Sequence, residues 1–174
     1  MSRHVSADLE GELIAAELTP SENIEGDDEE DTALLQKMWE EAWRYISSFA
    51  WCKSAIASYF GGGVGGIFAV FFFRIQPGRT GVDPWIWVMV GDVPSAYLPV
   101  TDCKSPGEAF RTYIRGMKKW VELARQGKEG TPEQGVPPVN VPATPEWAEQ
   151  LDKRLQMLEF VISPFFEGGA DAIH

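Results

Sequence analysis

The chain has 174 residues, of which 44% are hydrophobic, 24% are charged and 12% are aromatic. This composition excludes a wholly disordered or collagen-like chain, and the length fits one domain with a substantial core. Two cysteines are too few for a disulfide framework. The two histidines, His4 and His174, lie at the ends of the sequence, so we do not expect a Ser-His-Asp unit or a histidine-rich metal site.

The net charge of −11 is concentrated in the N-terminal part of the sequence. Residues 1–41 contain thirteen acidic and two basic residues, whereas residues 42–174 contain thirteen of each. We therefore predict an acidic flexible tail over residues 1–30, with a weak helix near residues 7–18, and a single α+β domain over residues 31–174. No apolar segment typical of a targeting peptide is evident, so we expect a cytoplasmic protein.

Residues 54–73 carry no charge and are long enough to cross a bilayer. Five of the six residues 61–66 are glycines, and each costs a helix about 0.8–1 kcal/mol relative to alanine. We therefore favour a helix from Asp31 or Thr32 to about Tyr59, a turn at the glycines and a buried strand over residues 67–75. Association with a membrane through residues 54–73 remains an alternative.

The rest of the sequence alternates further strand and helix signals. Residues 85–90 read as a second strand, and residues 96–100 read as a short third one. Ser105-Pro106-Gly107-Glu108 is a typical helix start, and the helix is expected to reach Gly127. A proline-rich connection leads to a final helix that opens at Thr144-Pro145. We predict an α+β fold in which a small antiparallel sheet of two to three strands packs against three helices, with a disordered acidic N-terminal tail.

Seven tryptophans are unusually many for this length. The helical patterns place four of them in the core, namely Trp39, Trp43, Trp120 and Trp147. Trp85 and Trp87 share one face of their strand, because side chains alternate along a strand. This pair either belongs to an aromatic core or anchors a partner on an open sheet face.

Two groups of charged residues are candidate sites. Arg111, Arg115 and Lys118 follow four- and three-residue steps, so they share one helix face, which is either a solvated surface or a docking surface. The acidic tail is expected to cover this face transiently, which makes nucleic acid an unfavourable partner for the full-length chain. The aspartates that precede or follow strands are candidates for a metal or acid–base site, or simply for turn formation. These aspartates are Asp83, Asp92 and Asp102. No cofactor is predicted.

Residues 85–97 contain the pattern Trp85-x-Trp87, followed by Gly91-Asp92-x-Pro94-x-x-Tyr97. This pattern resembles a family of small bacterial proteins described as a domain of unknown function, in which a similar helix start and a terminal helix follow in the same order. The resemblance implies a bacterial α+β protein, and it implies no activity or catalytic residues.

The leading hypothesis is a non-enzymatic protein-binding module whose partner is another protein. Small acidic α+β domains include immunity and inhibitor proteins, so this role fits by analogy. The competing hypothesis is an enzyme that uses the region of Asp83, Asp92 and Asp102 with a divalent metal.

Overall fold

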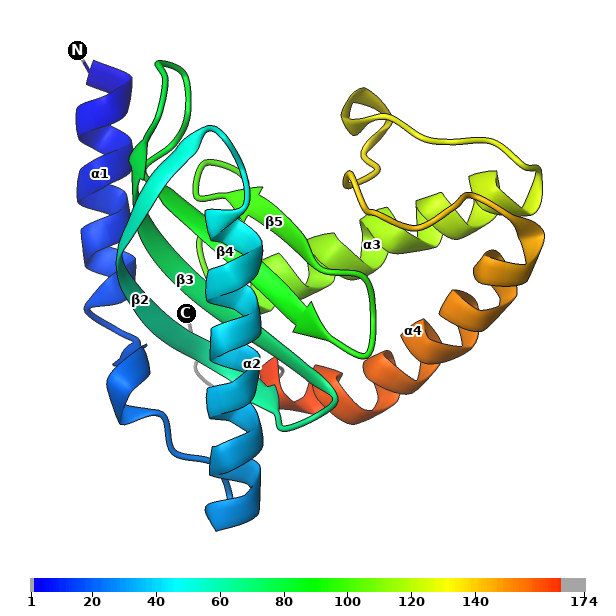
Figure 1. The fold of residues 1–174 in the computed structure, drawn as a ribbon, viewed down its shortest axis with the longest axis horizontal. Helices are drawn as coiled ribbons and strands as arrows, with labels where there is room; N and C mark the ends of the chain where they lie inside the picture. Colours follow the sequence, from blue (N-terminus) through cyan, green and yellow to red (C-terminus); the bar gives the residue numbers. More distant parts are fainter. Residues whose placement is uncertain (1, 167–174) are drawn as a thin grey trace.

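A five-stranded antiparallel sheet with helices on both faces organises residues 2–166, the part of the chain that this computed structural model describes (Figure 1). In chain order the elements are α1 (Ser2–Ala15), β1 (Thr19–Pro20), η1 (Ser21–Asn23), α2 (Glu29–Ser47), β2 (Cys52–Val64), β3 (Phe68–Pro77), β4 (Trp85–Gly91), β5 (Ala96–Pro99), α3 (Pro106–Arg125), η2 (Pro132–Gln134) and α4 (Pro145–Phe166). Each strand pairs with the next one along the chain. The α+β class and the antiparallel sheet are confirmed, but the sheet has five strands instead of two to three, and the described residues contain four α-helices instead of three.

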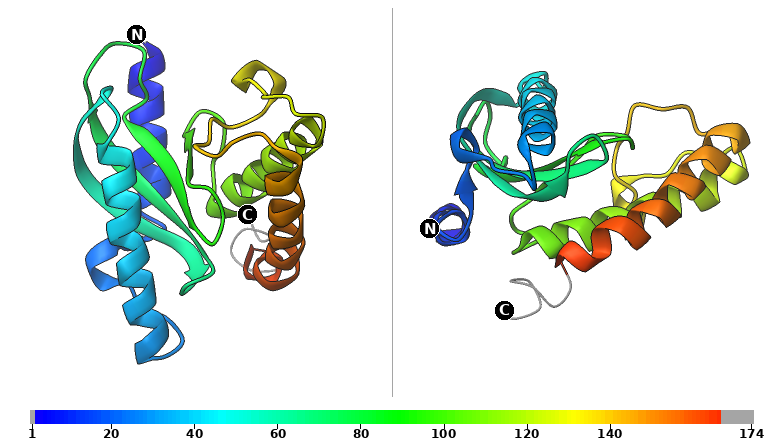
Figure 2. Two further views of the ribbon diagram at one scale, coloured as in Figure 1. Left: turned by 45° about the vertical axis from the view of Figure 1, so that its right-hand side comes forward. Right: turned by 90° about the horizontal axis from the view of Figure 1, so that it is seen from below.

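The central strands β3 and β4 are buried on both faces of the sheet. Residues 68–73 are all fully buried, and so is most of β4. Phe72 and Trp87 lie on the face covered by α3 and α4, whereas Phe71 and Val88 lie on the face covered by α2. The right-hand view of Figure 2 shows the sheet between these two layers. Because both faces are covered, residues 68–73 of β3 are all apolar instead of alternating between apolar and polar residues. Both predicted strands are therefore confirmed.

The predicted helix up to Tyr59 is wrong beyond Ser47, where α2 ends. The chain then forms β2, whose pairing with β3 shifts register at three places. These irregularities break the two-residue alternation that identifies a strand in a sequence. Gly66, at a φ of +80°, lies in the turn between β2 and β3, while the first glycines of the cluster belong to β2 itself.

Residues 54–73 are thus mainly two paired strands rather than a helix, and the helical reading on which the membrane alternative depended is wrong. Within residues 2–166, we find no helix with both the length and the apolar character needed to cross a membrane.

The disordered acidic tail is a second incorrect prediction. Most of residues 2–30 form α1, β1 and η1, and Ala15 and Ile24 are buried in the two apolar cores. Acidic side chains at the start of α2 accept hydrogen bonds from backbone amides. The Asp28 side chain caps α2 by accepting from the Asp31 amide, and the Asp31 carboxylate accepts from the Gly65 amide at 2.7 Å. The acidic residues therefore connect α2 to the β2–β3 turn.

The helices α3 and α4 form an antiparallel pair beneath the sheet (Figure 2). The predicted start of α3 is confirmed, because the Ser105 side chain accepts a hydrogen bond from the Glu108 amide. Trp120 is 4% exposed, as predicted for a core residue. Two of the predicted core tryptophans are instead exposed, Trp43 at 45% and Trp147 at 38%. The fourth, Trp39, is half-buried, and its indole N–H donates to the Ser58 hydroxyl at 2.8 Å.

Candidate functional site

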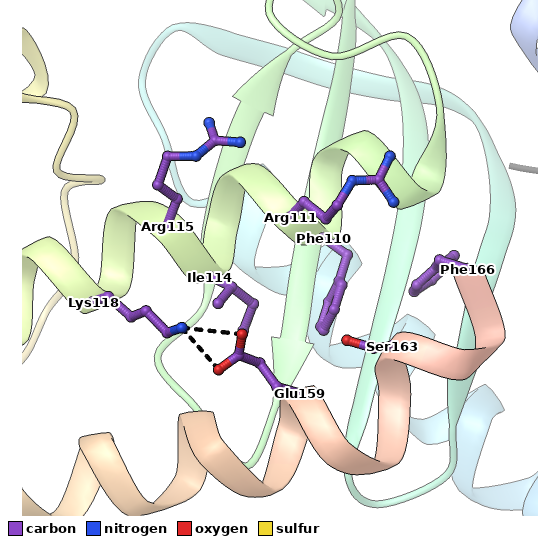
Figure 3. Close-up of a pocket in the computed structure, with 8 residues that line it drawn as sticks. All are labelled: Phe110, Arg111, Ile114, Arg115, Lys118, Glu159, Ser163 and Phe166. Carbon is purple, nitrogen blue, oxygen red and sulfur yellow. Dashed lines mark hydrogen bonds and ion pairs between the residues drawn. The ribbon is translucent and has the colours of Figure 1, made fainter. Parts of the chain in front are cut away.

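A groove of about 360 Å³ lies between the N-terminal half of α3 and the C-terminal half of α4 (Figure 3). The residues that line it are Phe110, Arg111, Ile114, Arg115, Lys118, Glu159, Ser163 and Phe166. The list includes the three basic residues that the sequence predicts for partner binding, so the structure brings them together along one groove. We call it the α3–α4 groove.

Helical spacing explains why α3 presents both basic and apolar side chains to this groove. Steps of three and four residues place Arg111, Arg115 and Lys118 along the exposed side of α3. Phe110 and Ile114 lie next to them and are buried. Phe166 of α4 meets Phe110 with ring centroids 5.4 Å apart. The groove therefore combines a cationic wall with an apolar floor.

The electrostatic balance of the groove favours an anion. Three cationic side chains line it, against the single carboxylate of Glu159. The Lys118 ammonium lies 2.9 Å from one Glu159 oxygen and 3.0 Å from the other, as the dashed lines in Figure 3 show. Both side chains are about half exposed, and such a pair contributes about 0–1 kcal/mol. The pair can therefore open for an incoming carboxylate at little cost.

Arg115 offers the strongest contact for a carboxylate. Among the described residues we find no hydrogen bond or ion pair that engages its side chain, and Figure 3 shows it directed away from the Lys118–Glu159 pair. A guanidinium is planar and always charged, so it binds carboxylates through two parallel hydrogen bonds.

Cationic and apolar side chains make up most of the described lining of the groove. Among the residues that the structure describes, the lining contains one hydroxyl, that of Ser163, and no histidine or cysteine. The Glu159 carboxylate is occupied by Lys118. The arrangement suits an acidic segment that also carries an apolar side chain.

Trp85 and Trp87 are placed inside the molecule and away from the groove. Both are buried. The centroid of the Phe72 ring lies 5.0 Å from that of Trp85 and 4.2 Å from that of Trp87. The Trp85 indole N–H donates to Asp8 of α1 at 2.8 Å, and that of Trp87 donates to the Cys103 carbonyl oxygen at 2.9 Å. Of the two sequence interpretations, the structure shows the aromatic core and not the open sheet face.

The three candidate metal-binding aspartates do not converge. Asp83 and Asp92 flank β4, a seven-residue strand that spans about 20 Å at roughly 3.3 Å per residue. Asp92 pairs with Arg154 at 3.8 Å, whereas Asp83 accepts a hydrogen bond from Thr101. Asp102 follows β5, and its amide closes a turn with the Pro99 carbonyl oxygen. In the described part of the chain, no group of three or more His, Cys, Asp or Glu side chains is placed to hold a metal ion.

The acidic N-terminal helix contacts basic residues other than the predicted ones. Asp8 and Glu12 lie 3.5 and 3.4 Å from Arg74, and Glu10 lies 2.8 Å from Lys104. We expected the acidic segment to contact Arg111, Arg115 and Lys118. Instead, these three acids contact Arg74 on β3 and Lys104 just before α3.

Cys103 is fully buried close to the start of α3, and burial raises the pKa of its thiol. The neutral thiol consequently prevails at pH 7, which argues against an activated nucleophile at this position.

Sequence reasoning did not find the α4 side of the groove. Glu159, Ser163 and Phe166 lie on the predicted final helix, but only the pairing of α4 with α3 gives them a role. The sequence does hold one signal: α3 has more basic than acidic residues, and some of its cations pair with acidic residues of α4.

Comparisons with protein-family models, with curated proteins and with solved structures found no match to this chain. The resemblance of residues 85–97 to a bacterial family remains a prediction. The fold and the groove define an α+β protein with a five-stranded antiparallel sheet and a basic groove on its paired helices.

Proposed function

We propose that this protein is a non-enzymatic protein-binding module of the immunity or inhibitor kind, acting in the bacterial cytoplasm, and that its α3–α4 groove receives an acidic, partly apolar segment of a partner protein. The observation that carries the proposal is the position of three cations around the apolar floor of one groove. Carboxylates of the partner bind Arg115 and Lys118, while a leucine or phenylalanine side chain packs on Phe110 and Phe166.

The charge of the whole chain makes this groove selective. At a net charge of −11, the protein repels long polyanions such as nucleic acid, so a local patch of cations favours a short acidic segment. The apolar floor adds a requirement that a phosphate backbone does not meet. The partner is therefore expected to present carboxylates and apolar side chains together.

The test uses two synthetic twelve-residue peptides as probes. One contains glutamate and leucine in alternation, and the other replaces every glutamate by lysine. Fluorescence anisotropy with the purified full-length protein measures both affinities. We expect the acidic peptide to bind and the basic peptide not to bind. Equal affinity for the two peptides, or no saturable binding of either, overturns the proposal.

Charge reversal assigns the binding to the groove. The double variant Arg115→Glu with Lys118→Glu should weaken binding of the acidic peptide by at least about tenfold, because hydrogen bonds to charged groups contribute about 1.5–3 kcal/mol. Lys119→Glu with Lys128→Glu is the matched control, since both lysines are exposed, neither lines the groove, and the change in net charge is the same. Equal losses in the double variant and in the control would show that the peptide senses overall charge and not the groove.

A further inference from the structure

A second pocket, of about 230 Å³, lies where the end of β4 meets the C-terminal half of α3 and the N-terminal half of α4. Its lining residues are Gly91, Asp92, Val93, Pro94, Trp120, Val141, Trp147, Leu151 and Arg154. We call it the indole pocket, and we propose that it binds a small aromatic carboxylate, with Arg154 holding the carboxylate and the two indoles enclosing the ring. None of these residues lines the α3–α4 groove.

The size and the walls of the indole pocket define the apolar part of the ligand. A volume of 230 Å³ equals the liquid volume of about seven or eight water molecules at about 30 Å³ each. This is below the roughly 300–1,000 Å³ that is typical of sites for drug-sized ligands, so a single ring is the expected size. Trp120, Val93 and Leu151 are buried, while Trp147 is partly exposed at the rim. Aromatic walls of this kind favour a planar ring.

Two indole side chains, those of Trp120 and Trp147, line the pocket. In the described part of the chain, neither Trp120 nor Trp147 has an acceptor for its indole N–H. Among the described residues, the fully buried side-chain nitrogen and oxygen atoms without a hydrogen-bond partner are the hydroxyl oxygens of Ser21 and Ser47. The Trp120 indole nitrogen is not one of them, so it keeps some contact with solvent. The Trp120 side chain as a whole is buried, with 4% of its surface exposed, and it lines this pocket. A nearly buried donor gains from a ligand acceptor.

Arg154 supplies the charge that selects a carboxylate. Its guanidinium lies 3.8 Å from Asp92, which is too long for a hydrogen bond, and both side chains are substantially exposed. Such a contact holds the arginine weakly. An incoming carboxylate can therefore take two parallel hydrogen bonds from Arg154, and Asp92 acts as its competitor.

The walls of the indole pocket are fixed before any ligand arrives. The Tyr113 hydroxyl donates to the Pro94 carbonyl oxygen at 2.6 Å, and the Asp92 amide donates to the Ile67 carbonyl oxygen at 2.9 Å. At the other wall, the Thr144 hydroxyl accepts from the Trp147 amide at 3.2 Å, which caps α4. A site formed in advance loses less entropy on binding.

The test titrates the full-length ¹⁵N-labelled protein with phenylacetate and follows the indole N–H signals by NMR. Trp147→Phe assigns the Trp147 signal, and because this residue is partly exposed the variant should fold. We expect saturable shifts of the Trp120 and Trp147 signals. Phenylacetamide, which keeps the ring and lacks the charge, should produce much smaller shifts at equal concentration. Absence of saturable shifts, or equal shifts with the amide, overturns the proposal.

Two charge variants identify the carboxylate contact. Arg154→Gln should weaken phenylacetate binding by about tenfold or more, whereas Asp92→Asn should strengthen it several-fold because the competing carboxylate is gone. Lys153→Gln is the matched control, since Lys153 is exposed on α4 and does not line the pocket. Unchanged affinity in Arg154→Gln contradicts the proposal. Binding of the acidic peptide should stay the same in Arg154→Gln, which separates this pocket from the groove.

Discussion

The first helix and the last two helices pack on one sheet through different forces. Asp8 and Glu12 of α1 pair with Arg74, while Leu9 and Leu13 of the same helix are 58% and 63% exposed. In α3 the arrangement is the opposite, since the apolar stripe is buried and the charged residues face outward. Ion pairs therefore make up a larger share of the contacts of α1 than of the helix pair, which is attached by apolar burial.

This difference determines which cations remain for a partner. Arg74 and Lys104 are engaged by acids of α1, so their charge is satisfied within the molecule. Arg115 and Lys118 line the α3–α4 groove, and among the described residues Lys118 pairs with one exposed carboxylate, that of Glu159. Exposed ion pairs contribute about 0–1 kcal/mol each, whereas full burial of a large apolar side chain contributes about 1.5–3 kcal/mol. We therefore expect α1 to be the first part to detach and the groove to stay intact.

The largest expected effect comes from the apolar side of the comparison. Trp120→Ala removes a buried side chain between α3, α4 and the sheet, and such changes cost about 3–5 kcal/mol. Thermal or urea unfolding should show a loss of this size. Trp43→Ala is the control, because Trp43 is exposed on α2, and we expect less than about 1 kcal/mol there. Equal losses in the two variants would show that α3 is not packed as described.

A smaller effect is expected at the closest approach of α1 to the sheet. A Cβ atom at Gly11 would lie 2.2 Å from the indole of Trp85, so Gly11→Ala forces α1 to move away. Such overpacking typically costs about 1–3 kcal/mol, whereas alanine would otherwise favour the helix by about 1 kcal/mol. Circular dichroism during urea unfolding should show a net loss of stability. A net gain would mean that the helix does not touch Trp85.

The smallest effect tests the polar attachment of α1 directly. Arg74→Gln removes the partner of Asp8 and Glu12, so amide hydrogen exchange over residues 8–15 should become several-fold faster at low salt. The difference from the unchanged protein should shrink in 1 M salt, where screening acts over about 3 Å. Arg44→Gln, which loses an exposed pair with Glu40 inside α2, should leave residues 8–15 unaffected. A salt-independent difference would contradict the electrostatic attachment.

The sequence predicts the parts of the fold whose signals are local. Ser105 and the apolar stripe of α3 identify that helix, and the buried strands β3 and β4 are recognisable from their composition. The sequence does not identify β2 as a strand, because its register shifts remove the alternation of apolar and polar residues. Residues 52–60 are mostly apolar and come shortly after a helix, so they resemble the end of that helix. The acidic N-terminal part was misread because its partners, Arg74 and Gly65, lie far away in the sequence.

The candidate site shows the same division. The spacing of Arg111, Arg115 and Lys118 predicts a shared helix face, and the structure places them along one groove. Glu159 and Phe166 join them through the pairing of α3 with α4, which no local pattern encodes. Spacing along one element is readable from a sequence, whereas contacts between distant elements depend on the complete fold.

The most direct test of the account maps the acidic peptide on the ¹⁵N-labelled protein by amide chemical-shift changes. The account predicts that the shifts concentrate on residues 110–118 and 159–164, and that residues 8–15 keep their positions. Shifts centred on residues 8–15, Arg74 and Lys104 would show that the peptide displaces α1 instead, and this result would contradict the central claim that the groove between α3 and α4 is the binding site.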